Sequence, residues 1–169
     1  RRERLGGRAW TAASSPPGSS PRPRLSAPPP PIERPRYPGM DAHNHLGPDF
    51  GGGWSERPVA ELLDALDQAD VRVYVDLDGG WGEQILNQRL EHFKAAAPER
   101  FRIFGGVDWS KWPEHGDRFG EWAAAQFRAQ VARGAEGLKI WKPFGLHGRD
   151  QHGALVAVDD PRLDPLGAA

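Results

Sequence analysis

The pattern of apolar and polar positions changes near residue 39. Residues 1–38 are rich in Arg, Pro, Ser and Gly and carry few apolar side chains, so they cannot bury enough surface to offset the entropy lost on ordering. We predict a disordered leader over residues 1–38, with polyproline character at residues 28–31. From residue 39 onward, apolar residues recur with the periods of strands and helices, so residues 39–169 are predicted to form one folded domain.

Strand and helix signals alternate through this domain. Val59, Leu62, Leu63 and Leu66 recur at i, i+3, i+4 and i+7, which predicts a helix with one apolar face, and Ser55 is its expected N-cap. The predicted strands are one that begins at residue 39 and ends at the histidines 43 and 45, and three over residues 71–78, 101–108 and 135–142. Two further helices are predicted over 84–97 and 117–133. An irregular excursion or hairpin is predicted over 144–160, followed by a helix start at Asp160-Pro161.

Four strands alternating with three helices are typical of parallel βαβ units. A doubly wound sheet and part of a (β/α)8 TIM barrel both fit this α/β pattern. A complete barrel needs ~250 residues, so the 169-residue chain without its leader would hold about the first four βα units. The chain does not begin with Met, and we expect it to be a truncated part of a longer protein.

Charge and composition exclude several classes of partner. The formal net charge is −1, yet residues 1–38 contain eight Arg and two Glu, so the predicted folded domain is acidic and is not expected to bind nucleic acid. No apolar run approaches the ~18–20 residues that span a bilayer, and no apolar stretch follows Arg1-Arg2, so we expect no membrane partner, no secretory signal and a cytoplasmic protein. Without cysteine, a disulfide or a thiolate metal site is impossible.

The first strand carries the strongest candidate chemistry. Residues two apart in a strand point to the same side, so Asp41, His43 and His45 share one face. Two imidazoles on one face at a strand end can bind a single divalent metal, and neutral imidazole suits zinc. Asp41 would then hold a ring nitrogen or a backbone group.

Other polar residues fall at the carboxyl ends of the later strands, where ligands gather in both architectures. Asp76, Asp78 and Asp108 are either site residues or caps of the turns that follow them. Lys139 lies inside an apolar predicted strand, where a buried lysine needs a carboxylate partner or the negative charge of a substrate. We therefore name Lys139 and Asp108 as candidate pocket residues. Several aromatic residues either wall an apolar pocket or pack in the core: Trp54, Trp81, Trp109, Trp112, Trp141 and Phe144.

The motif of the predicted first strand resembles the first-strand signature of the amidohydrolase superfamily. Three later segments resemble the amidohydrolase-related branch of that superfamily. The quoted segments are Asp41-Ala42-His43-Asn44-His45-Leu46-Gly47, Asp108-Trp109, Gly137-Leu138-Lys139-Ile140-Trp141-Lys142 and Asp159-Asp160-Pro161-Arg162-Leu163. The resemblance implies a (β/α)8 barrel with zinc or another divalent metal bound by His43 and His45. It also implies a metal-dependent hydrolase or decarboxylase that acts on a small organic acid or lactone.

Members of that branch take further ligands from the fifth, sixth and eighth strands, which this chain does not reach. We therefore expect weak metal binding and little turnover from this polypeptide by itself. Two alternatives stay open: a TatD-type or PHP-type metal-dependent phosphoesterase, whose first strand is similar, and a non-catalytic truncated fragment. The expected partners are a small-molecule substrate and a second copy of the chain, which would close the barrel as a homo-oligomer.

Overall fold

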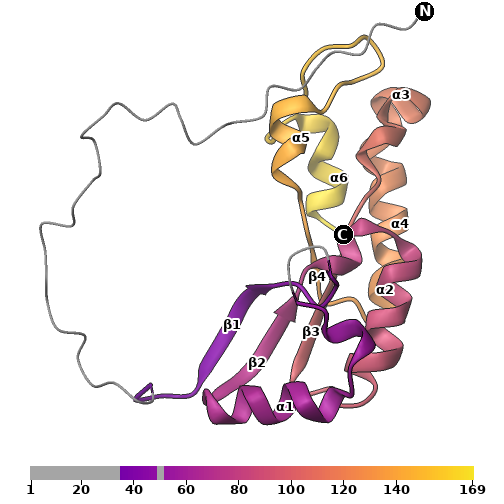
Figure 1. Ribbon diagram of the computed structural model, residues 1–169. Helices are drawn as coiled ribbons and strands as arrows, with labels where there is room; N and C mark the ends of the chain where they lie inside the picture. Colours follow the sequence, from indigo (N-terminus) through magenta and orange to yellow (C-terminus); the bar gives the residue numbers. More distant parts are fainter. Residues whose placement is uncertain (1–34, 49–51) are drawn as a thin grey trace, which may run out of the picture. The chain divides into compact units, whose positions relative to one another are not determined.

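Four parallel strands form one sheet in the computed structural model, in the order β1-β2-β3-β4 (Figure 1). The structure describes residues 35–48 and 52–169. The strands are β1 (Gly39–Asn44), β2 (Val71–Asp76), β3 (Phe101–Gly105) and β4 (Gly137–Leu138). Since neighbouring strands are parallel and follow the order of the chain, the predicted α/β class and the βαβ alternation are confirmed.

The strand order bears on the two architectures that the sequence left open. A doubly wound sheet reverses its strand order at a switch point, whereas the strands of a barrel follow one another in sequence. The curled sheet with its sequential order therefore fits a partial barrel. Of the predicted disordered leader, residues 1–34 lie outside the described residues, and the chain enters β1 after residues 35–38.

The helices of the described residues differ in length, and only two of them exceed seven residues. They are α1 (Val59–Gln68), α2 (Glu83–Arg89), α3 (Trp112–His115), α4 (Phe119–Arg133), α5 (Lys142–His147) and α6 (Asp164–Gly167). In α1 the predicted apolar face is confirmed, because Leu62 and Leu66 are buried. The expected cap is wrong: α1 begins after Pro58, and Ser55 lies in a separate 3-10 turn, Trp54–Glu56.

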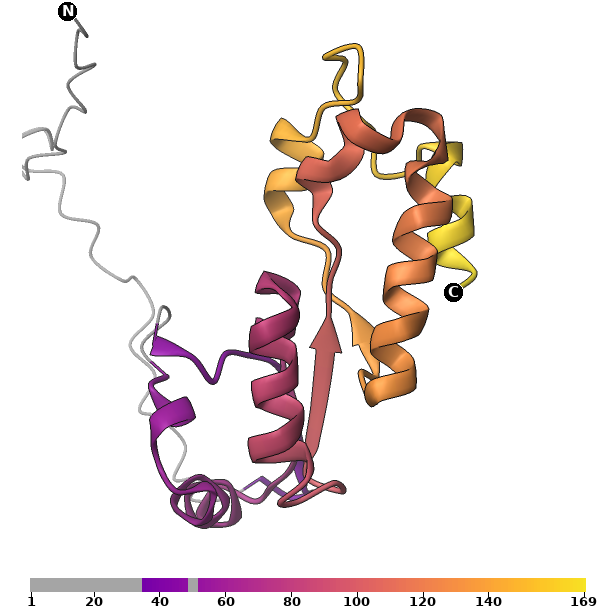
Figure 2. The ribbon, with the colours of Figure 1, turned by 90° about the vertical axis from the view of Figure 1, so that its right-hand side faces the viewer.

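Helices α2 and α4 run alongside β3 (Figure 2). Helix α2 continues into a π-helical turn at Leu90–Lys94, so the predicted helix over 84–97 is present but irregular in its second half. Helix α4 ends where the sequence predicted, at Gly134, whose φ of 117° is a left-handed conformation that glycine adopts without a steric penalty.

The fourth predicted strand is much shorter than expected, because β4 contains only two residues. The backbone N–H of Lys139 still donates to the carbonyl of Gly105 at 2.8 Å, after which the chain turns into α5. Within the predicted excursion, Arg149 and Leu155 form an antiparallel bridge. The helix start predicted at Asp160-Pro161 is confirmed: the Asp160 carboxylate accepts from the backbone N–H of Arg162, and α6 follows.

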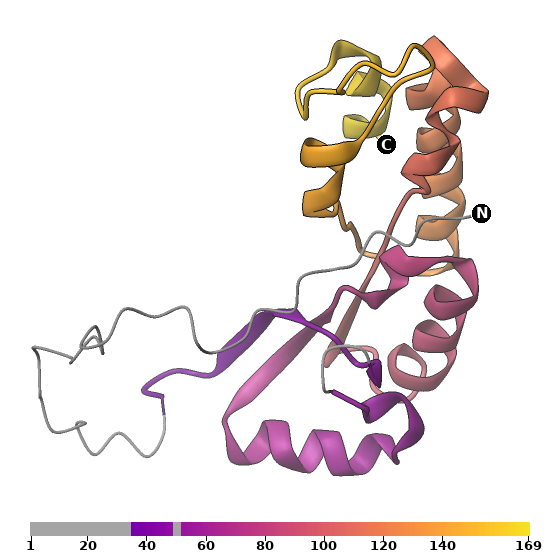
Figure 3. The same ribbon diagram turned by 45° about the horizontal axis from the view of Figure 1, so that its top comes forward.

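The C-terminal segment packs against α4 (Figure 3). Arg162 links this segment to the residues before α4 and to the excursion, because its guanidinium forms ion pairs with Asp117, Asp150 and Asp160. The same guanidinium carbon lies 5.0 Å from the ring centre of Trp112, which is a cation–π contact.

Two clusters of buried side chains form the core. The first lies between the early strands and α1 and α2, and contains Leu46, Leu62, Leu66, Tyr74, Leu86, Phe93, Phe101, Ile103 and Ala135. The second lies among α3, α4, α5 and α6, and contains Val107, Trp112, Phe119, Ala123, Phe127, Phe144, Val156 and Leu166. Within the described ranges, no helix is both long enough and apolar enough to cross a membrane.

Candidate functional site at the carboxyl ends of the strands

The two histidines of the first motif lie together at the end of β1. Their ring centres are 5.6 Å apart and the ring planes meet at 67°. His43 is exposed and His45 is half-buried. The shared face predicted from strand periodicity thus brings both imidazoles to one place.

Asp78 orients the second of these histidines. Its Oδ1 lies 2.7 Å from Nδ1 of His45, and its Oδ2 accepts from the backbone N–H of Gly47 at 2.6 Å. Asp41, which the sequence suggested for this role, accepts instead from the side-chain amide of Asn44. The carboxylate that supports His45 therefore comes from the end of β2 rather than from β1.

Asp76 and Arg89 complete a buried charged cluster beside Asp78. Oδ1 of Asp76 accepts from the backbone N–H of Leu46 at 3.0 Å, while Arg89 donates to Oδ2 of Asp78 at 3.4 Å. Nε of Arg89 is 3.9 Å from Oδ2 of Asp76. All three charged residues are less than 5 % exposed.

Burial and the negative charge of Asp78 raise the pKa of Asp76 from 3.8 to about 7, although the Leu46 N–H and the Arg89 guanidinium act in the opposite direction. Burial also raises the pKa of Tyr74, helped by the carboxylates of Asp76, Asp41 and Asp78. Two carboxylates and one guanidinium thus share a site with little water, and the excess of negative charge favours a proton on Asp76.

A first pocket, which we call the histidine pocket, has a cavity of about 450 Å³. Its lining residues are His43, His45, Lys139, Ile140, Trp141, Lys142, Gly145 and Val158. Lys139 is half-buried rather than enclosed in a strand, and its Nζ lies 5.9 Å from the ring centre of Trp141. Three of the candidate site residues, the two histidines and Lys139, are therefore neighbours.

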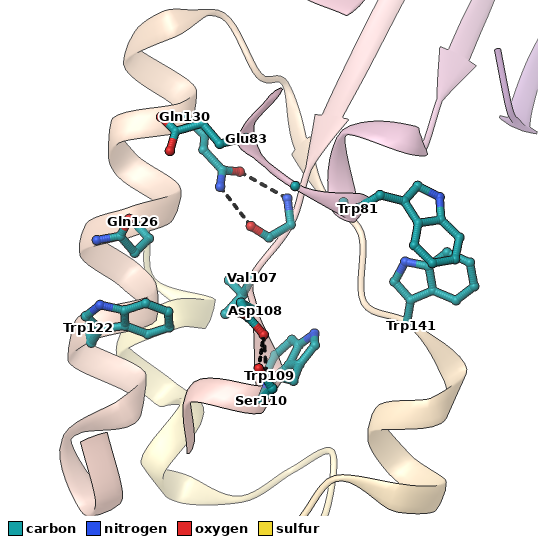
Figure 4. A pocket seen from close by; sticks show the side chains of 13 residues that line it. Trp81, Glu83, Val107, Asp108, Trp109, Ser110, Trp122, Gln126, Gln130 and Trp141 are labelled. Carbon is teal, nitrogen blue, oxygen red and sulfur yellow. Dashed lines mark hydrogen bonds between the residues drawn. The ribbon is translucent and has the colours of Figure 1, made fainter. Parts of the chain in front are cut away.

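A second pocket, which we call the tryptophan pocket, has a cavity of about 550 Å³ (Figure 4). Its lining residues are Gly80, Trp81, Gly82, Glu83, Gly106, Val107, Asp108, Trp109, Ser110, Trp122, Gln126, Gln130 and Trp141. The fourth candidate, Asp108, lies here and not beside the histidines. Its Oδ1 accepts from the backbone N–H of Ser110 at 3.0 Å, so it also caps the 3-10 turn Trp109–Lys111.

The two pockets adjoin, because Trp141 lines both of them. Trp141 packs on Trp81 with ring centres 3.9 Å apart. Across the tryptophan pocket, α4 presents Trp122, Gln126 and Gln130 at intervals of one helical turn (Figure 4). Among the described residues, no group of three or more His, Cys, Asp or Glu side chains is placed to hold one metal ion.

Two parts of this arrangement were not predicted. Arg89 lies three residues after Leu86, on the face of α2 that packs in the core, and a charged residue on an apolar helix face signals a buried partner. Trp122 and Gln126 carry no comparable signal, because a half-exposed face of an amphipathic helix is ordinary.

Part of the chain is similar to a known protein. No family model matches the chain, and no solved structure matches it. A glycogen synthase from Burkholderia thailandensis is 35% identical over 104 residues, which are 60% of this chain and 18% of that protein. The chain therefore matches less than a fifth of the length of this relative.

This similarity contradicts the function expected from the sequence. A glycogen synthase, as its name says, builds a sugar polymer, whereas the expected hydrolase or decarboxylase would cleave a small organic acid or lactone. The phosphoesterase alternative does not agree with the match either, whereas a match to 18% of that protein does not test the alternative of a non-catalytic fragment. The predicted reaction is therefore wrong on this comparison, while the metal, the small-molecule substrate, the homo-oligomer and the cytoplasmic compartment stay predictions.

Proposed function

We propose that His43 and His45 bind one divalent metal ion, with zinc as the expected ion. The observation that carries this proposal is the contact between Asp78 and Nδ1 of His45 at 2.7 Å, beside a second imidazole whose ring centre is 5.6 Å away. Metal-binding histidines commonly donate their other ring N–H to a carboxylate, which fixes the tautomer and the ring orientation.

The geometry of the pair suits this role. In the tautomer that donates Nδ1–H to Asp78, the lone pair of the His45 ring is on Nε2. Zinc lies about 2.0–2.1 Å from each imidazole nitrogen, so two imidazoles on a tetrahedral ion have ring centres roughly 5 Å apart. The observed separation of the ring centres, 5.6 Å, is close to this value, and the His43 ring is exposed.

Two protein ligands are fewer than the three that catalytic zinc sites usually have. We therefore expect weaker binding than at a three-histidine site, with water in the remaining positions. When bound, such an ion acts as a Lewis acid toward an oxygen of a ligand. Asp78 holds His45 in place, and Arg89 balances part of the negative charge of that carboxylate.

Calorimetric titration of the full chain with Zn²⁺ tests the proposal. Replacement of either histidine by Ala should lower the affinity at least about tenfold, and Asp78→Asn should lower it about 10–100-fold, as is typical when the partner of a metal-bound histidine is removed. The matched control is His92→Ala, which removes an exposed histidine outside the pocket and should leave the affinity unchanged. Equal zinc affinity in the wild type and in the double variant His43→Ala with His45→Ala would show that the pair is not the site.

The similarity to a glycogen synthase favours a second candidate function, in which the domain takes part in glycosyl transfer and binds a glucose polymer. This candidate does not depend on the histidine pair. Binding of glycogen to the immobilised full chain tests it directly, and unmodified resin is the control.

We also propose that the fold is the first half of a (β/α)8 barrel. The sequential parallel strands support the first half of a (β/α)8 barrel, and the resemblance of β1 to the amidohydrolase superfamily supports descent from that barrel without its hydrolytic reaction.

A further inference from the structure

We propose that the tryptophan pocket binds the pyranose rings of a neutral carbohydrate. The proposal rests on the second candidate function, glucose-polymer binding, and names the site. Its cavity of about 550 Å³ lies within the range of about 300–1,000 Å³ that is usual for ligand pockets.

The walls provide the apolar surfaces that a sugar ring needs. A pyranose carries C–H groups on its faces, and these groups pack on the electron-rich face of an indole. Trp109 follows β3, Trp122 lies on α4, and Trp81 and Trp141 lie together on the remaining side (Figure 4). His115 stacks on one face of Trp122 with ring centres 4.4 Å apart, which fixes the orientation of this indole.

Polar groups stand at the edges of these aromatic walls. Sugar hydroxyls project from the ring edge and need both acceptors and donors. Asp108 and Glu83 supply carboxylate acceptors through their second oxygens, because Oδ1 of Asp108 accepts from Ser110 and Oε1 of Glu83 accepts from Arg133. The exposed amide of Gln126 supplies a donor and an acceptor. The neighbouring amide of Gln130 is already engaged, because it bonds both the N–H and the carbonyl of Gly106.

The charge of the pocket selects against anionic ligands. The described residues that line it include two carboxylates and no Lys, Arg or His. Arg133, outside the lining, pairs with Glu83, so Asp108 carries the negative charge that is not balanced by an ion pair in the lining. A phosphate or carboxylate ligand would meet repulsion there, whereas a neutral ligand rich in hydroxyl donors would not. A Cβ at Gly106 would overlap the backbone of Gly80, so only glycine permits the close approach of these two lining segments.

Isothermal titration of the full chain with maltoheptaose, a linear oligomer of glucose, tests the site. Trp122→Ala should lower the affinity about tenfold or more, and Gln126→Ala should lower it several-fold, because each removes one kind of contact. Trp122→Phe keeps an aromatic face and should recover most of the affinity. The controls are Tyr37→Ala, which removes an aromatic ring that is 70% exposed outside the pocket, and Gln68→Ala, which removes an exposed glutamine from α1.

The possible results distinguish a failure of the tryptophan pocket as the binding site from a failure of glucose-polymer binding as the function. Weaker binding by Trp122→Ala and Gln126→Ala, with both controls unchanged and all variants folded by circular dichroism, is the expected result. Binding that persists unchanged in the two pocket variants would overturn the site but leave glucose-polymer binding intact. Absence of maltoheptaose binding and glycogen binding by the wild type would overturn both, and stronger binding of inorganic phosphate than of maltoheptaose in this pocket would overturn the neutral-ligand assignment.

Discussion

Replacement of Asp76 by Asn should remove a large part of the pH dependence of folding. Asp76 is fully buried, and burial together with the charge of Asp78 raises its pKa to about 7. Asn is neutral at every pH and nearly isosteric, and its side-chain oxygen can still accept from the N–H of Leu46. The substitution therefore mimics the protonated carboxyl and removes its titration.

The sign and size of the pH effect on the free energy of unfolding follow from the pKa of this carboxyl in the folded and unfolded chain. Its pKa is about 7 in the folded chain and 3.8 as the reference for the unfolded chain, so the folded state binds the proton more tightly. The resulting stabilisation is fully present below about pH 4 and is lost as pH rises toward 7, with no further change above it. At about 1.4 kcal/mol per pKa unit, the free energy of unfolding should fall by on the order of 4 kcal/mol across this window.

Urea unfolding between pH 4 and pH 8, followed by tryptophan fluorescence, measures this change. The difference in the free energy of unfolding between Asp76→Asn and wild type should grow with pH and reach its plateau near pH 7.5, where the variant is the more stable protein. Asp64→Asn changes an exposed carboxylate on α1 and should give a profile parallel to the wild type. A parallel profile for Asp76→Asn as well would refute the reasoning, because Asp76 would then ionise as it does in water.

Two further substitutions test the packing. Phe93 is fully buried against Phe101, so Phe93→Ala should lower the free energy of unfolding by about 3–5 kcal/mol, measured by urea unfolding, and a loss under 1 kcal/mol would mean that the first core cluster is loosely packed. Gly120→Ala would place a Cβ against the carbonyl oxygen of Arg162, so it should destabilise the protein by about 1–3 kcal/mol and speed amide exchange in α6, although Ala usually favours a helix over Gly. A more stable variant would contradict the close approach of α4 to this segment.

The regular elements were predictable where periodicity alone decides them. The apolar face of α1 and the glycine stop of α4 follow from residues close together in the sequence, and both are present. The fourth strand was overestimated: Ile140 and Trp141 are residue types that favour strands, but only Gly137 and Leu138 pair with β3 in the ladder. Pairing partners and the turn into α5 set its length, and these are tertiary properties.

In the candidate site, too, local sequence predicts one part and tertiary pairing decides the other. Strand alternation places His43 and His45 on one face, and that part needs no knowledge of the fold. Which carboxylate supports His45 cannot be read from local spacing, because Asp41 is four residues away and Asp78 is 33 residues away. The pairing of β1 with β2 brings the distant residue closer than the near one.

The end of β2 explains why so much charge is buried at this place. Asp76 closes the strand and Asp78 begins the 3-10 turn that follows, and their carboxylates accept from the consecutive N–H groups of Leu46 and Gly47. The loop after the two histidines is therefore fastened to β2 by both acids, while Arg89 supplies the one compensating cation within the described cluster. Because one guanidinium cannot neutralise two carboxylates, a proton on Asp76 completes the balance. The buried pair of acids therefore has two effects: Asp78 holds His45 in position, and Asp76 makes the stability of the domain depend on pH.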